Sequence, residues 1–215
     1  MGFYENLLHN LEVIKACGGC DSPLAKEAYE AMKYDIEWRI RESTTKGGTA
    51  KNLLKFCQKC LDSVAHDPML NGAWEADGKQ YVCDGKIVIE MEEPLDLPKL
   101  ENPNPFNVKQ MINGAEQGGW SEEIKLDDTF LADLKVAKAK YPKRHYVLHI
   151  DRDASINADY LQQAIKSMGA LTIHKPTNIK SIYKLENGGT TTIWMLPVKL
   201  APNCVPIKEG QISIF

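Results

Sequence analysis

The sequence predicts an α+β fold in which helices cover one face of antiparallel strands. A helical pattern followed by a series of short strand-like runs occurs twice along the chain, which indicates an internal duplication. Tight-turn dipeptides, Asp77-Gly78 and Asp84-Gly85, separate the short runs of the first series, as in a meander. With 215 residues, 43% of them hydrophobic, the chain can bury a sizeable core in one large or two small domains.

Residues 1–45 are expected to form an N-terminal helical segment with two helices. Apolar residues recur at helical spacing in residues 3–14, and two glycines end this pattern. Ser22 followed by Pro23 is typical of an N-cap with proline at the first helical position. The second helix should therefore run to about Arg41.

A third helix is expected after Thr49, which can serve as its N-cap. At about 100° per residue, its apolar side chains and both of its cysteines fall in one arc. This predicted buried stripe consists of Leu53, Leu54, Cys57, Cys60, Leu61 and Val64. Because a free cysteine behaves as a small hydrophobe, core packing is the favoured interpretation of Cys57 and Cys60.

The two C-x-x-C pairs leave a second interpretation open. In a reducing compartment such pairs indicate zinc or thiol chemistry before structural disulfides. Cys17-Gly-Gly-Cys20 makes a turn that can present two thiolates, and a four-cysteine site would combine it with Cys57 and Cys60. A zinc- or thiol-dependent protein is therefore the alternative function, whereas the favoured interpretation needs neither a metal nor another cofactor.

The opposite arc of the third helix is basic. Lys51, Lys55 and Lys59 stand at four-residue spacing, so they form a ridge that suits contact with DNA phosphates. An ordinary solvated helix face gives the same pattern. The formal net charge of −3 and the pI near 6.0 argue against nucleic-acid binding through overall charge, so any contact with duplex DNA should be local.

Two series of strands frame a long connection. Residues 69–91 read as a three-stranded meander. The span 94–142 is proline-rich at first, then polar and glycine-interrupted, and ends in a capped helix, so it reads as an insertion or long connection. Residues 144–153 then predict a strand. Residues 155–169 predict a helix that is capped by Ser155 or Asn157 and ends at Gly169. Three more strands should follow up to about residue 200.

Residues 46–200 resemble a domain of the bacterial DNA sliding clamp, the beta subunit of DNA polymerase III. The likeness lies in the run NLLKFCQKCLDSVAHDPMLNGAWEADGKQYVCDGKIVIEM and in INADYLQQAIKSMGALTIHKPTNIKSIYKLENGGTTTIWMLPVKL. Its ending is similar to the family's Met-Pro-x-Arg-Leu, with Met195, Pro197, Lys199 and Leu200 in that pattern and Leu196 as one extra residue. The resemblance implies a non-catalytic α+β domain of two helix-plus-meander repeats that acts in DNA replication or repair. Family rings contain several such domains per chain, so ring formation and self-association stay open.

The last five residues, within a tail of residues 201–215, carry the second resemblance. Gln211, Ile212, Ser213, Ile214 and Phe215 are similar to the Gln-Leu-Ser/Asp-Leu-Phe peptide by which bacterial polymerases and repair proteins bind the sliding clamp. The glutamine amide can orient such a peptide by hydrogen bonds, and the final aromatic residue can fill an apolar pocket. The resemblance implies a sliding clamp as the partner, and an edge strand of the protein's own sheet is the alternative.

No enzyme is predicted. His66-Asp67, His145, His149 and the run Asp151-Arg152-Asp153 could supply acid–base or metal-binding groups, but no nucleophile motif or phosphate loop accompanies them. No apolar run approaches the roughly 20 residues that span a bilayer, and the first residues lack a signal-peptide pattern. The expected location is the cytoplasm, without membrane contact.

Overall fold

The computed structural model describes residues 2–102, 105–151, 154–178, 181–198 and 204–207. The chain divides into two compact units, Met1–Lys51 and Asn52–Phe215. The boundary lies within the first turn of α3 (Gly48–Ser63). The candidate functional surfaces described below lie mainly in the second unit.

The first unit contains two helices, α1 (Phe3–Ala16) and α2 (Pro23–Thr44), as the sequence predicted. The Ser22 hydroxyl accepts a hydrogen bond from the backbone N of Ala25 at 3.1 Å, which confirms it as the N-cap of α2. The two helices share a small buried cluster made by Leu11, Tyr29 and Ile36. Ion pairs between Lys33 and Glu12 at 3.0 Å and between Lys15 and Glu30 at 3.7 Å join their exposed sides.

Helix α3 confirms the predicted apolar stripe. Its buried side chains are Leu53, Leu54, Phe56, Cys57, Cys60 and Leu61. The predicted cap is wrong by two positions, because the helix begins at Gly48, so that Gly47 is its N-cap and Thr49 lies inside its first turn. Val64, the last predicted member of the stripe, follows the end of the helix and is only half-buried.

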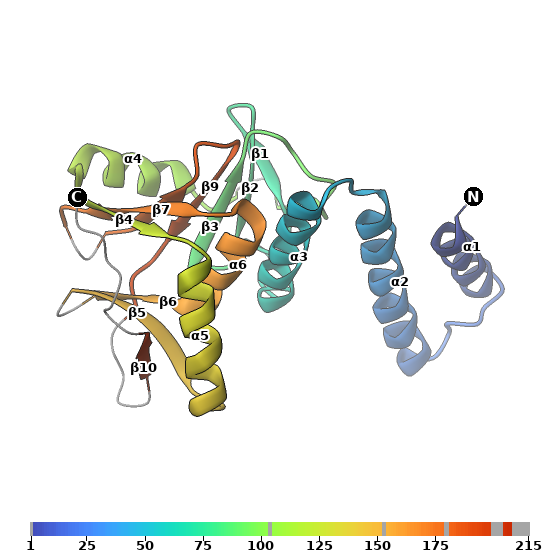
Figure 1. The fold of residues 1–215 in the computed structure, drawn as a ribbon. Helices are drawn as coiled ribbons and strands as arrows, with labels where there is room; N and C mark the ends of the chain where they lie inside the picture. The colour runs from blue at the N-terminus through green and yellow to red at the C-terminus, as the bar shows by residue number, and fades with distance from the viewer. Residues whose placement is uncertain (1, 103–104, 152–153, 179–180, 199–203, 208–215) are drawn as a thin grey trace. The chain divides into compact units, whose positions relative to one another are not determined.

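A seven-stranded sheet forms the centre of the second unit (Figure 1). Its strands are β1 (Trp74–Ala76), β2 (Lys79–Cys83), β3 (Ile87–Met91), β4 (Trp120–Leu126), β7 (Leu171–Pro176), β8 (Tyr183–Glu186) and β9 (Thr191–Met195). They lie in the order β1-β2-β3-β9-β8-β7-β4, and each neighbouring pair is antiparallel. The two predicted meanders are therefore joined edge to edge through β3 and β9.

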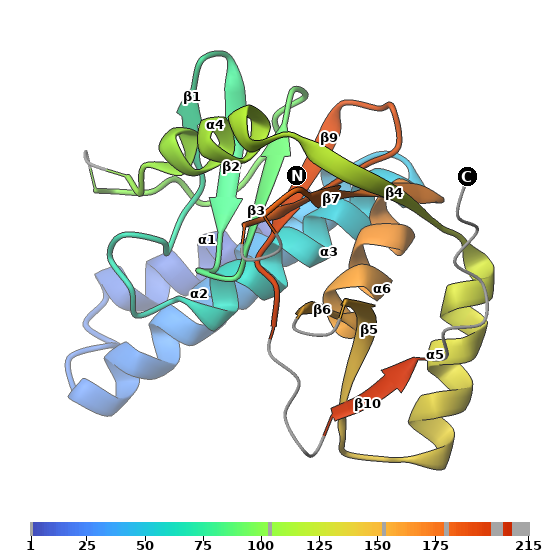
Figure 2. The same cartoon turned by 90° about the vertical axis from the view of Figure 1, so that its left-hand side faces the viewer.

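The helices that precede the two meanders lie side by side on one face of this sheet (Figure 2). The Asn52 side chain of α3 donates a hydrogen bond to the carbonyl of Lys166 in α6 (Ala158–Met168) at 2.8 Å. One turn further along α3, the Phe56 ring lies 6.3 Å from the ring of Tyr160. Because the α3 numbers rise while the α6 numbers fall, the helices run antiparallel. The predicted α+β fold with two helix-plus-meander repeats is thus confirmed.

A third helix, α4 (Val108–Gly118), covers part of the opposite face of the sheet (Figure 1). Along β3, Val88 packs in the cluster beneath α4, whereas strand alternation assigns the buried Ile89 to the face that α3 and α6 cover. The register pairs Val88 with Trp194 and Ile89 with Ile193, so the alternation continues into β9. The middle strands are consequently buried on both faces, which explains their nearly continuous apolar sequence.

The span 94–142 contributes a strand that the sequence interpretation missed. Between α4 and α5 (Asp128–Lys140), β4 pairs with β7 from Trp120 to Leu126 and becomes an edge of the sheet. Ile124 and Leu126 are buried, while the alternating Glu123 and Lys125 are exposed. This span is therefore part of the domain's own sheet as well as a connection.

A smaller sheet contains β5 (His145–Asp151), β6 (Ala154–Asn157) and β10 (Cys204–Ile207) in the order β10-β5-β6. Asn157 is the N-cap of α6, because its side chain accepts from the backbone N of Asp159 at 2.8 Å. Ser155, the other predicted cap, lies within β6. Strand β10 pairs in parallel with β5, so the first part of the predicted tail joins this sheet as an edge strand. In the described ranges, no helix has both the length and the apolar character needed to cross a membrane.

Candidate functional site

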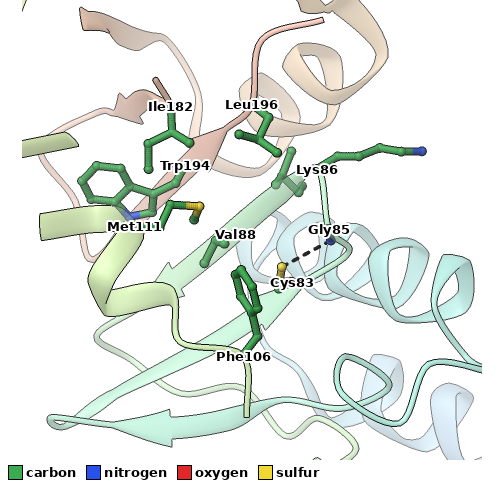
Figure 3. A pocket seen from close by; sticks show the side chains of 10 residues that line it. Cys83, Gly85, Lys86, Val88, Phe106, Met111, Ile182, Trp194 and Leu196 are labelled. Atoms are coloured by element: carbon green, nitrogen blue, oxygen red, sulfur yellow. Dashed lines mark hydrogen bonds between the residues drawn. The ribbon is translucent and has the colours of Figure 1, made fainter. Parts of the chain in front are cut away.

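An apolar hollow lies on the α4 side of the seven-stranded sheet, and we call it the apolar pocket (Figure 3). It is lined by Cys83, Gly85, Lys86, Ile87, Val88, Phe106, Met111, Ile182, Trp194 and Leu196. These residues come from both meanders, from α4 and from the connection that precedes it. The pocket therefore exists only because β3 and β9 are neighbours.

The size of the apolar pocket limits what it can hold. Its cavity volume is about 50 Å³, and its lining is almost entirely apolar. Sites for small-molecule ligands usually measure roughly 300–1,000 Å³. The apolar pocket thus suits one apolar side chain of a partner better than a metabolite.

The turn at the mouth of the apolar pocket is held in place by Asp84. Its carboxylate accepts hydrogen bonds from the backbone N of Lys86 and of Ile87, both at 2.9 Å. It also accepts one from the Tyr160 hydroxyl of α6 at 2.5 Å. Gly85 has a φ of +80°, in the region that favours glycine. Backbone and side-chain bonds together therefore fix the shape of this rim.

The thiol beside the apolar pocket is not an activated nucleophile. Burial raises the pKa of Cys83 to about 11, so the thiol stays protonated at neutral pH. The backbone N of Gly85 donates to its sulfur at 3.3 Å. Cys83 contributes an apolar wall here, as most buried cysteines do.

The predicted lysine ridge lies along α3. Lys55 and Lys59 are exposed, and Lys51 is half-buried. The hydrogen bond from Asn52 places the backbone of Lys166 beside α3, and the Lys166 side chain is exposed. The antiparallel packing of α3 and α6 thus adds a basic residue near the ridge, which the separate sequence patterns did not indicate.

Within neither of the two units do the described residues gather the cysteines of the alternative function into a metal site. Cys57 and Cys60 are buried in the apolar stripe of α3, and burial raises the pKa of the Cys57 thiol to about 12. Cys17 is exposed and Cys20 half-buried at the turn between α1 and α2. Across the described ranges, no group of three or more His, Cys, Asp or Glu side chains is arranged to hold a metal ion.

Of the histidines considered as catalytic residues, His149 lies near a described hydroxyl, whereas His66 and His145 are exposed. His66 is exposed, and the carboxylate of Asp67 beside it accepts a hydrogen bond from the backbone N of Met69 at 2.8 Å. His145 is exposed at the start of β5, whereas His149 lies 3.4 Å from the Ser155 hydroxyl. Arg152 and Asp153, and the side chain of Asp151, lie outside the described part of the chain.

The sequence interpretation missed a charged cluster on the outer strands of the sheet. His174 of β7 lies between two carboxylates, with Nε2 2.9 Å from Glu186 and Nδ1 3.4 Å from Glu123. The ammonium of Lys184 lies 2.6 Å from Glu186 and, more than any other neighbour, lowers the pKa of that carboxyl. Glu123, His174 and Glu186 border a shallow hollow of about 440 Å³. Their contacts span β4, β7 and β8, so the cluster ties the edge strand β4 to the sheet.

The predicted clamp-binding residues Gln211, Ile212, Ser213, Ile214 and Phe215 lie outside the described residues. The same holds for Lys199 and Leu200 of the Met-Pro-x-Arg-Leu-like ending. Met195 is buried at the end of β9, and Leu196 lines the apolar pocket.

Comparison with known proteins finds no matching family model and no matching curated protein. Among solved structures, the chain is similar to DNA polymerase III subunit beta from Borrelia burgdorferi in complex with a natural product, with 14% identity and a TM-score of 0.46 over 68% of this chain and 62% of that one. It is also similar to the Helicobacter pylori beta clamp bound to DNA ligase peptide, with 9% identity and a TM-score of 0.49 over 69% and 62%. A putative DNA polymerase III beta subunit from Eubacterium rectale gives 9% identity and a TM-score of 0.37 over 57% and 41%.

These structures are sliding clamps, the family that residues 46–200 resemble in sequence. The chain spans 62% of the length of the first two. The likeness concerns the fold, and no role of a residue is transferred from it.

Proposed function

We propose that this chain is a non-catalytic, clamp-like accessory protein of DNA replication or repair, which binds a sliding clamp through residues 211–215. The observation that carries the proposal is the duplicated architecture. Two helix-plus-meander units are joined through β3 and β9, and their helices lie antiparallel on one face of a single sheet. This is the arrangement that the sequence resemblance implied for residues 46–200.

The described surfaces support docking rather than catalysis. The apolar pocket has room for one side chain, and its thiol is protonated at neutral pH. The side chains around His174 contact one another, and Lys184 forms an ion pair with Glu186. A protein built this way is suited to act by positioning partners.

The tail supplies the chemistry of a docking peptide. Glutamine at position 211 offers two amide donors and an acceptor, so it can fix the register of a bound peptide. Ile214 and Phe215 offer a compact apolar anchor, the type of group that dominates binding energy in small interfaces. The preceding β10 ends at Ile207, and eight residues follow it in the sequence.

Binding of the full chain to a purified bacterial sliding clamp tests this role. We expect Phe215→Ala to cost about 2 kcal/mol or more, roughly thirtyfold in affinity, because the variant removes the largest apolar anchor. Lys208→Ala, just upstream of the anchor residues, is the matched control and should bind as the unaltered chain does. Equal affinity of all three proteins for the clamp would reject the tail as the binding element.

We further propose that the ridge of Lys51, Lys55 and Lys59 contacts the phosphates of duplex DNA. The exposure of Lys55 and Lys59 and the proximity of α6 with its exposed Lys166 support this. Because the chain carries a net charge of −3, we expect weak binding that depends strongly on salt.

A further inference from the structure

A second basic surface lies far from α3 in the sequence. Residues 135–144 contain five of the chain's 26 lysines and arginines, and no acidic residue stands between Asp133 and Asp151. In a chain with a net charge of −3, this is a local concentration of positive charge.

The structure gathers part of this charge at one corner. Helix α5 ends at Lys140, Tyr141 follows as its C-cap, and β5 begins at His145. The corner, drawn at the lower edge of both Figure 1 and Figure 2, lies at the opposite end of α5 from the seven-stranded sheet. We call Lys140, Tyr141, Lys143 and Arg144 the basic corner; all four side chains are exposed.

The backbone of the basic corner is anchored. The hydroxyl of the buried Tyr146 donates a hydrogen bond to the carbonyl oxygen of Tyr141. Lys143 has a φ of +61°, a left-handed conformation that turns the chain sharply into β5. Tyr141 is 44% exposed beside this anchored backbone.

The charges of the basic corner are not neutralised by the described residues. Lys138, one turn earlier, is paired with Asp159 of α6 at 2.6 Å and donates to Gln162 at 2.9 Å. By contrast, Lys140, Lys143 and Arg144 form no ion pair with a residue that the structure describes. The neighbouring strand β10, which starts opposite His145, contains no charged residue from Cys204 to Ile207.

The helix dipole accounts for only part of this pattern. Lysines in the last turn of a helix are favoured by its negative C-terminal end, and this explains Lys138 and Lys140. Lys143 and Arg144 lie beyond the helix, where this effect is lost. The dipole also does not explain why the exposed Tyr141 lies among these cations. The ammonium of Lys140 lies 5.2 Å from the centroid of the Tyr141 ring.

We propose that the basic corner binds single-stranded nucleic acid. Tyr141 stacks on an unpaired base, while Lys140, Lys143 and Arg144 contact phosphates on either side of it. Exposed aromatic rings among cations are the elements with which proteins bind single strands without sequence preference. A duplex hides its base faces from such a ring, and an acidic peptide offers no planar group to stack on it. This inference is independent of the tail and of the ridge on α3.

Fluorescence anisotropy of the full-length chain with a labelled oligothymidine of about a dozen nucleotides tests the proposal. Three phosphate contacts predict that log K falls with log salt at a slope of about −2. Tyr141→Ala should weaken binding about tenfold and leave this slope unchanged, while Tyr141→Phe should retain binding, because only the ring is needed. Lys143→Glu with Arg144→Glu should weaken binding and flatten the slope.

Lys26→Glu with Lys99→Glu is the matched control, because both lysines are exposed and the net charge changes equally. This variant should bind within twofold of the unaltered chain, and thermal melting should show that all variants are folded. The proposal is wrong if Tyr141→Ala binds normally, if the control loses as much affinity as the corner variant, or if anionic lipid vesicles bind at the corner while the oligothymidine does not.

Discussion

At the scale of single residues, Asp84 and Tyr160 connect the two halves of the duplicated fold. Asp84 lies in the β2–β3 turn of the first half and is 7% exposed, and Tyr160 lies in α6 of the second. The Tyr160 hydroxyl donates a hydrogen bond of 2.5 Å to the Asp84 carboxylate, which also accepts hydrogen bonds from two backbone N–H groups. Burial, followed by the contact with Asp84, raises the pKa of Tyr160 well above its usual range. The hydroxyl is therefore a permanent donor at physiological pH.

Tyr160→Phe should lower the free energy of unfolding by about 1–2 kcal/mol, because the buried carboxylate loses one of its donors while the ring packing is kept. Urea denaturation of the two proteins measures this difference. Tyr141→Phe removes a hydroxyl from an exposed ring and is the control, with an expected change below about 0.5 kcal/mol. Equal stability of Tyr160→Phe and the unaltered chain would show that this bond does not stabilise the fold.

Local signals in the sequence predicted many individual residues correctly. The burial of Cys57 and Cys60 follows from their angular position on α3, and Ser22 and Asn157 are caps because their side chains reach the first free N–H groups. The Asp84–Tyr160 bond spans 76 residues of sequence, so no local pattern could indicate it. The lining of the apolar pocket was missed for the same reason, since it forms only when the two meanders meet.

At the scale of secondary structure, five of the six helices and the two meanders were predicted, whereas α4 and three strands were not, among the residues that the structure describes. In β4 the buried Ile124 and Leu126 alternate with charged residues, and the polar stretch before them hid the pattern. Strand β6 has four residues and runs directly into the cap of α6. Strand β10 contains Pro206, which is tolerated because the strand lies at a sheet edge. Each of these strands is stabilised by distant partners rather than by its own sequence.

The lysine ridge is a property of one helix, and its test is a charge reversal. Lys51→Glu with Lys55→Glu should abolish binding of the full chain to duplex DNA. Binding of the unaltered chain should weaken as salt rises. If each of the three lysines contacts one phosphate, at roughly −0.9 per contact, the slope of log K against log salt should be near −3. Electrophoretic mobility shift at several salt concentrations provides the measurement. Lys26→Glu with Lys99→Glu changes the net charge equally and should bind normally. If the ridge variant binds duplex DNA as tightly as the unaltered chain does, DNA contact by the ridge is not part of the function.

At the scale of the molecule, the second unit combines a duplicated clamp-like architecture with features suited to binding partners. The apolar pocket lies where the two meanders join, the lysine ridge lies on α3, and the basic corner lies at the end of α5. The described residues form no group of ligands for a metal, and the thiols of Cys57 and Cys83 are kept protonated by burial. The sequence pattern predicted the duplication, because helical and strand periods repeat in the same order along the chain.

The central claim is that residues 211–215 form a docking peptide rather than a strand of this protein's own sheet. The most direct test is to truncate the chain after Gly210 and to measure both its melting temperature and its binding to a purified bacterial sliding clamp. We predict an almost unchanged melting temperature, because a docking tail contributes little to its own core, together with complete loss of clamp binding. A synthetic peptide ending in KEGQISIF should compete with the full chain for the clamp. A melting temperature lowered by many degrees, with no clamp binding by the full chain, would contradict the account and identify the tail as an edge strand.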